Sequence, residues 1–263
     1  MVDIKEQRSF RAFWKTWRDH LNKLATARGA KLLCPTSDEL EFNETAIGYI
    51  AKPGRPVGLI ALPQKGASGS EGHKLVAFID GTFSFSNQHQ ASTLVSADSH
   101  VAFFKSTAGA QRSTLNLIEA YHFDHFNVNP KESSPHPVFH AQRNIRSDDC
   151  FPSFSSCLNS DPQNNLDIGH LEQQEKNDLF RLKTFRLPTP QIDLFSLSVI
   201  IAADHLVDKC SHDSSAYQSF KSFLKHVSVN NTSITKVQHQ HNVRADAAVA
   251  DNRFVWQWYA ATH

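Results

Sequence analysis

The feature that most constrains the fold is a run of short segments between residues 39 and 145 in which apolar and polar side chains alternate. They are ELEFNETAIGYIA, PVGLIALP, HKLVAFIDGTFSFS, STLVSADSHVAFFKS, NLIEAYHFDHF and HPVFHAQRNI. Stretches of turn composition, such as KPGRP and NVNPKESSP, separate them. Because no helical pattern lies between these segments, we predict a meandering antiparallel sheet of about six strands rather than βαβ units.

An amphipathic helix is predicted before this sheet, over residues 6–28. Its apolar side chains follow an i, i+3, i+4, i+7 spacing and are Phe10, Phe13, Trp14, Trp17, Leu21 and Leu24. Gly29 is well placed to end the helix. We expect the apolar stripe to cover one face of the sheet.

The second half of the chain contains a polar segment followed by a segment with helical patterns. Residues 146–180 are polar and rich in Ser and Asn, and we interpret them as a long excursion with one short helix near residues 171–180. Residues 181–263 form a helical half, with a buried helix over about 191–209 that Thr189 caps and another that starts near Ser215. The prediction is one α+β domain, 1–263, made of 1–145, 146–180 and 181–263.

Composition restricts the classes of partner and compartment. The formal net charge of +1 gives no global signature of binding to polyanions. The N-terminal residues lack the apolar core of a secretory signal, and the longest apolar run is too short to span a bilayer. The four cysteines form no C-x-x-C pair, so we expect reduced thiols, a cytoplasmic location and no membrane association.

The candidate site lies on the last two segments of the predicted sheet. On a strand, His136, His140 and Gln142 share one face, and His122 and Asp124 share a face of the strand before. Antiparallel pairing would bring His122, Asp124, His136 and His140 onto one surface, although a slip of one residue would separate them.

Three chemistries suit this set of residues. Imidazoles and a carboxylate can hold a divalent transition metal, and two histidines can act as general acid and base in a metal-free phosphodiesterase. The same groups can also serve only as hydrogen-bond partners of a ligand. Pro137 after His136 and the flanking Val138 and Phe139 favour a strand, which excludes the helical H-E-x-x-H zinc motif. A purely structural role for the histidines stays open beside these three.

A second candidate surface is the basic face of the first helix, formed by Arg8, Arg11, Lys15 and Arg18. Basic side chains beside aromatic ones are typical of proteins that bind single-stranded nucleic acid. The alternative is a solvated face above an apolar stripe, as in most amphipathic helices.

Two short motifs resemble a family of uncharacterised bacterial proteins found in phage-defence and toxin neighbourhoods. They are H-P-x-[FY]-H-x-Q, matched by His136, His140 and Gln142, and R-[IL]-P-x-P, matched by Arg186, Pro188 and Pro190. The resemblance implies a bacterial, defence-associated role and attaches no catalytic role to these positions. Gln142, on the face of the two histidines, and Arg186, on a predicted strand that could bind an anionic group, are candidates for substrate or partner contact.

Two classes of function follow from these observations. The first is a binding or interaction protein with a protein partner, within a defence or toxin module. The second is a His-dependent hydrolase, either a nuclease or a phosphodiesterase, with or without a bound metal.

Overall fold

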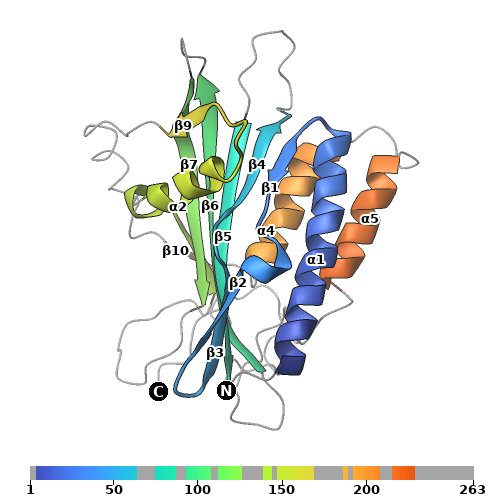
Figure 1. The fold of residues 1–263 in the computed structure, drawn as a ribbon, viewed down its shortest axis with the longest axis vertical. Helices are drawn as coiled ribbons and strands as arrows, with labels where there is room; N and C mark the ends of the chain where they lie inside the picture. The colour runs from blue at the N-terminus through green and yellow to red at the C-terminus, as the bar shows by residue number, and fades with distance from the viewer. Residues whose placement is uncertain are drawn as a thin grey trace.

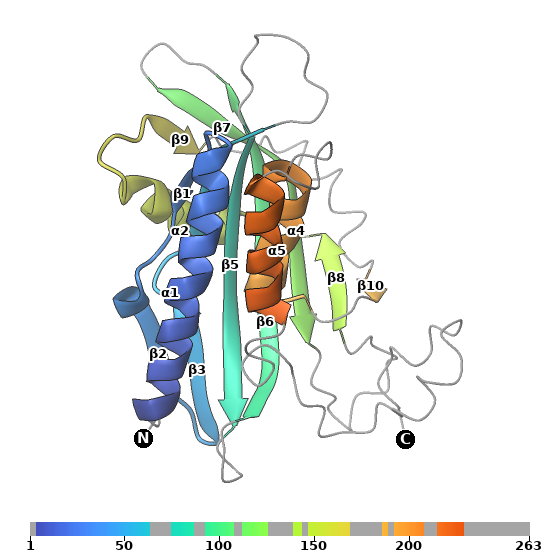
Figure 2. The same ribbon diagram turned by 90° about the vertical axis from the view of Figure 1, so that its right-hand side faces the viewer.

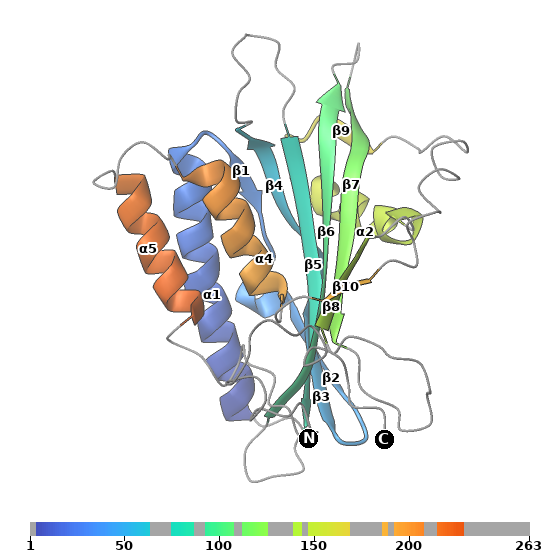
Figure 3. The same cartoon turned by 180° about the vertical axis from the view of Figure 1, so that it is seen from behind.

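The chain is described here from a computed structural model, in which residues 4–63, 75–86, 93–107, 112–125, 139–143, 147–168, 186–188, 192–207 and 215–228 are placed. In this part of the chain a ten-stranded sheet lies between helices, with α1, α4 and α5 on one face and α2 on the other (Figure 1; Figure 3 shows the same layers from behind). The predicted α+β class, with an N-terminal helix, an antiparallel sheet and C-terminal helices, is confirmed.

The elements follow one another in this order: α1 Ile4–Ala27, β1 Lys31–Leu33, η1 Ser37–Glu39, β2 Leu40–Glu44, β3 Gly48–Pro53, β4 Val57–Leu62, β5 Leu75–Ser86, β6 Thr93–Thr107, β7 Ser113–His125, β8 Phe139–Arg143, α2 Ser147–Asn159, β9 Leu166–Ile168, β10 Arg186–Pro188, α4 Leu194–Ile201, η2 Ala202–Leu206 and α5 Ser215–Ser228.

The sheet is built around an antiparallel meander. Strands β4, β5, β6, β7 and β8 are neighbours in chain order, with β1 beside β4 at one edge and β10 beside β8 at the other. The β2–β3 hairpin joins the sheet through pairing of β3 with β5, and β9 pairs parallel to β7. The strand count exceeds the predicted six because residues 39–51 contribute to two strands and because the short β1, β9 and β10 also join the sheet.

Helix α1 buries its aromatic stripe against the sheet, as the sequence predicts. All six stripe residues are buried, and Gly29 ends the helix in a left-handed conformation with φ of 70°. The indole nitrogens are also satisfied: Nε1 of Trp14 donates to the Pro35 carbonyl at 2.9 Å, and Nε1 of Trp17 donates to Ser198 Oγ at 2.9 Å. Because the indoles have partners, the stripe can be fully buried without an unpaired N–H group.

Helices α4 and α5 complete this face of the molecule (Figure 2). The ring of Phe195 in α4 lies 4.8 Å from that of Phe13 and 5.3 Å from that of Trp17. His226 of α5 stacks on Phe13 with ring centroids 4.5 Å apart, and its Nε2 donates to the Phe13 carbonyl at 3.2 Å. The first and last described helices are therefore joined by a buried polar contact as well as by apolar packing.

Helix α4 starts later than predicted. Its N-cap is the buried Asp193, whose Oδ1 accepts a hydrogen bond from the Ser196 amide at 2.8 Å, so the predicted helix start near residue 191 is wrong. The proposed cap Thr189 lies outside the described residues. A carboxylate three residues before the amide it accepts from is the usual N-cap geometry, which explains why the helix begins where it does.

Helix α2 covers part of the opposite face. Phe154, Cys157 and Leu158 pack against sheet residues that include Phe78 and Phe104, with the rings of Phe154 and Phe78 stacked at 4.8 Å. The prediction of a polar excursion over 146–180 is thus wrong for residues 147–168, which form α2, a turn and β9. The short helix predicted near 171–180 lies outside the described residues.

Among the described helices, none combines the length and apolar character needed to cross a bilayer.

The contact between α1 and α4 generates a stability prediction. Ser198→Ala leaves the buried Nε1–H of Trp17 without its acceptor, so we expect the free energy of unfolding to fall by about 1–3 kcal/mol. Urea denaturation followed by Trp fluorescence measures this loss.

Ser222→Ala in α5 is the matched control, because that exposed hydroxyl only donates to the Gln218 carbonyl one turn back. We expect the control to change stability by less than about 0.5 kcal/mol. Equal effects of the two substitutions would contradict a structural role for the indole–hydroxyl contact.

Candidate functional site

Polar side chains replace the apolar core on the α2 face of the sheet, next to the area that α2 covers. Along β5, Val76 and Phe78 belong to the α2-side core, and the next residue on that face is Asp80. Directly opposite Asp80 stands His100 in β6, and opposite His100 stands His122 in β7. The row continues with Gln142 in β8 and Arg186 in β10.

These residues, Asp80, His100, His122, Gln142 and Arg186, are called the polar row below. Residues paired directly across antiparallel strands have side chains on the same face, so the register alone places the row on one surface. Asp80, His100, His122 and Gln142 are half-buried. A half-buried polar row beside the packed area under α2 is a place where a ligand can be held by several groups at once.

The two imidazole rings of the row lie against each other. Their centroids are 4.0 Å apart and the ring planes are inclined by 31°. Nδ1 of His100 and Nε2 of His122 are shielded from solvent. Each neutral imidazole has one N–H donor and one acceptor nitrogen, so the pair sets donors and acceptors side by side.

Asp80 supplies an acidic group beside the imidazoles. Its Oδ1 accepts a hydrogen bond from the Gly81 amide at 2.8 Å. Burial raises the pKa of Asp80 to about 6, against the opposing effects of that hydrogen bond and of the Lys52 charge. The carboxyl group therefore changes its protonation state close to neutral pH, where functional acids and bases operate.

A second row of mostly polar residues lies two positions further along the strands, on the same face of the sheet. Asp98 stands opposite Thr82, Asp124 stands opposite His140, and His140 stands opposite Pro188. The predicted sharing of one face by His122, Asp124 and His140 is therefore met by the backbone register. Gln142 and Arg186 also occupy this face, and His136 lies outside the described residues.

A metal centre at this surface stays a prediction. Among the side chains that the structure describes, no three His, Cys, Asp or Glu residues are grouped closely enough to hold a metal ion. The predicted ligand set of His122, Asp124, His136 and His140 is not tested by this finding, because only the His122 side chain belongs to that part of the protein.

The basic face of α1 is partly committed to structural contacts. The guanidinium of Arg11 donates to the carbonyls of Ser37 and Leu40, lies 3.6 Å from Asp38 Oδ1, and sits 5.2 Å from the centre of the Phe42 ring. These contacts fix η1 and β2 against α1. A nucleic-acid surface on this helix therefore depends mainly on the exposed Arg8 and Lys15, and on Arg18, which pairs with Asp19 at 3.7 Å.

Sequence reasoning missed Asp80 and His100. His100 belongs to a stretch, SADSHVAFF, in which polar residues alternate with apolar ones and look like the solvent side of a strand. The available signal was Asp80, which follows the apolar run LVAFI on the same face as the buried Val76 and Phe78. A charged residue beside buried ones is uncommon, and the register places it opposite His100.

The raised pKa of Asp80 predicts a specific pH dependence of stability. The folded protein holds this proton more tightly than the unfolded chain, so Asp80 stabilises the fold below pH about 4, and this contribution is lost as pH rises through about 6. We expect Asp80→Asn to gain about 1–3 kcal/mol relative to the wild type between these limits. Urea unfolding curves at closely spaced pH values measure the difference, and a difference that does not change with pH would contradict the assignment.

Comparison of the chain with protein-family models, with curated proteins and with solved structures finds no match, so the candidate site rests on its own geometry.

Proposed function

We propose that the protein binds a nucleotide-like ligand on the polar row. The observation that carries this proposal is the direct register of Asp80, His100, His122, Gln142 and Arg186 across adjacent strands. Adjacent strands are about 4.8 Å apart, so the row extends over roughly 19 Å and offers an extended ligand several points of contact.

The order of residues along the row favours a ligand with two different ends. Asp80 stands at one end and Arg186 at the other, with the imidazoles and the Gln142 amide between them. An arginine position is suited to a phosphate group, and a carboxyl group accepts hydrogen bonds from amino groups of a base. Half-burial of the intervening side chains strengthens these polar contacts relative to open solvent.

The wider setting belongs to the same proposal. The defence or toxin module, the protein partner and the cytoplasmic location are supported by the motif resemblance and by composition alone. The basic face of α1 lies on the other side of the sheet from the polar row (Figure 1), so nucleic acid bound there would make a separate contact through its phosphates.

Binding is tested with the intact protein and 5′-AMP, ATP and a short single-stranded oligonucleotide, measured by calorimetry. We expect His122→Ala and Gln142→Ala each to weaken the affinity roughly tenfold, because each removes one hydrogen bond to the ligand.

His20→Ala is the control for this experiment, since His20 lies between α1 and α5 on the other side of the sheet. Its affinity should equal that of the wild type. The proposal fails if the wild type binds none of the three probes, or if the control loses as much affinity as the two row variants.

A second candidate function is phosphodiester hydrolysis, favoured by the close pair of His100 and His122. One neutral imidazole would take the proton from the attacking hydroxyl or water as its oxygen bonds to phosphorus. The other, protonated, would give its proton to the leaving oxygen as the phosphorus–oxygen bond breaks. Asp80, opposite His100, would stabilise the protonated form of the pair.

Turnover of bis(p-nitrophenyl) phosphate and of oligonucleotides tests this second function. We expect His100→Ala and His122→Ala each to lower kcat by roughly 10²-fold or more with little change in KM, because proton transfer is lost while binding remains.

Assays with and without EDTA separate the metal-free mechanism from a metal-assisted one, and His20→Ala again serves as the control. A wild type that binds nucleotides without turning over either substrate would eliminate the hydrolase and leave the binding protein.

A further inference from the structure

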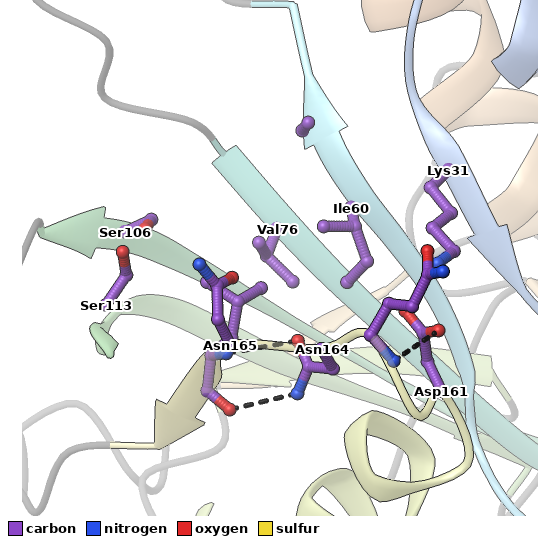
Figure 4. A pocket seen from close by; sticks show the side chains of 11 residues that line it. Lys31, Ile60, Val76, Ser106, Ser113, Asp161, Asn164 and Asn165 are labelled. Atoms are coloured by element: carbon purple, nitrogen blue, oxygen red, sulfur yellow. Dashed lines mark hydrogen bonds and ion pairs between the residues drawn. The ribbon is translucent and has the colours of Figure 1, made fainter. Parts of the chain in front are cut away.

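A cavity of about 300 Å³ lies on the α2 face at the far side of α2 from the polar row. Figure 4 shows it between the ends of β4, β5 and β6 and the turn that joins α2 to β9. Aliphatic side chains of Ile60, Val76 and Leu166 contribute to its lining. Apart from Ala61, the rest of the lining is polar and includes the hydroxyl groups of Ser106 and Ser113.

The charges at this cavity neutralise each other. Nζ of Lys31 forms an ion pair with Oδ2 of Asp161, and hydrogen bonding from Lys31 holds the pKa of that carboxyl below its ordinary value. The other carboxylate oxygen, Oδ1, accepts from the Gln163 amide at 3.3 Å. A charged ligand would have to lose its hydration here without gaining a free counter-charge from the described lining residues.

The turn beside the cavity is fixed by its own hydrogen bonds. Oδ1 of Asn164 accepts from the Leu166 amide at 3.1 Å, and its Nδ2 donates to the Leu166 carbonyl at 3.0 Å. The main chain of Asn165 accepts from the Ser113 amide at 2.9 Å, which ties the turn to β7. These contacts leave the Asn165 side chain, which lines the cavity, at a defined place on its wall (Figure 4).

A strained residue lies in the same wall. Ala61 has φ of 62°, the one positive value at a non-glycine residue in the described part of the chain. It falls where β4 slips in register against β5, between Leu59 and Leu62. An alanine in this conformation costs about 1–2 kcal/mol, and strain of this kind concentrates at ligand sites.

We infer that this cavity binds a neutral, polyhydroxylated molecule of monosaccharide size. Hydroxyl and amide groups on the wall can both donate to and accept from sugar hydroxyls, and the aliphatic groups can pack against the ring carbons. The volume lies at the lower end of the range for small-molecule pockets, which suits a single ring. The inference is independent of the polar row and of the function proposed for it.

The test uses the full chain with D-glucose, D-galactose and D-ribose, and with D-glucuronate and D-glucosamine as charged counterparts. Saturation-transfer NMR detects binding, and calorimetry measures the affinity. We expect at least one neutral sugar to bind and the charged counterparts to bind at least tenfold more weakly.

Two adjacent residues of β7, whose side chains point to opposite faces of the sheet, test whether the sugar binds in this cavity. Ser113→Leu fills the cavity and should weaken sugar binding at least tenfold, whereas Thr114→Leu, an exposed neighbour, should leave it unchanged. If Ser113→Leu does not fold, Asn165→Leu at the exposed turn serves instead.

Three results would overturn the inference: no binding of any neutral sugar at millimolar concentration, tighter binding of a charged counterpart, or equal loss in both leucine variants. His122→Ala should bind the sugar as the wild type does, so that failure here and failure of nucleotide binding are distinguishable.

Discussion

Burial of the α1 aromatic stripe against the sheet is the interaction on which the rest of the structure depends. The two indoles are fully buried because each has an acceptor, one from the chain after β1 and one from α4. Phe195 lies against both Phe13 and Trp17, so the same cluster that seats α1 also seats α4. Large aromatic side chains contribute most of the apolar area in such a core, and their loss would release both helices together.

Because α1, α4 and α5 all lie on one face of the sheet, α2 alone among the described helices covers the other face. Helix α2 is short and covers the sheet around Phe78 and Phe104, and the strands extend beyond it in both directions. On one side of α2 the sheet carries the polar row, and on the other it carries the cavity beside Lys31 and Asp161. The α2 face therefore presents two chemically different surfaces with an apolar contact between them.

The sequence predicts some of these features and not others, for reasons that can be given residue by residue. The α1 stripe repeats at helical spacing over several turns, and its end at Gly29 follows from the left-handed conformation that glycine adopts freely. Helix α2 escapes prediction because Phe154, Cys157 and Leu158 supply only a short stripe inside a polar stretch that also contains Pro152.

The candidate site is predicted only in part for a related reason. Alternation assigns His122 and Asp124 to one face, but it does not say which strand lies on the far side of β7, because pairing is a tertiary property. The contact between His122 and His100 therefore appears only when β6 and β7 are paired in the observed register. The place of Asp80 in the polar row is likewise a result of strand pairing, which sets it opposite His100.

The stacking of His226 on Phe13 joins residues more than two hundred positions apart in the chain, and this separation bears on how the protein is made. The aromatic stripe of α1 is synthesised before Phe195, Phe223 and His226, which belong to its final environment. Contacts this distant in sequence are slow to form, and exposed apolar surface favours aggregation until they do. The core around α1 is therefore complete only after α4 and α5 have been synthesised and have packed against it.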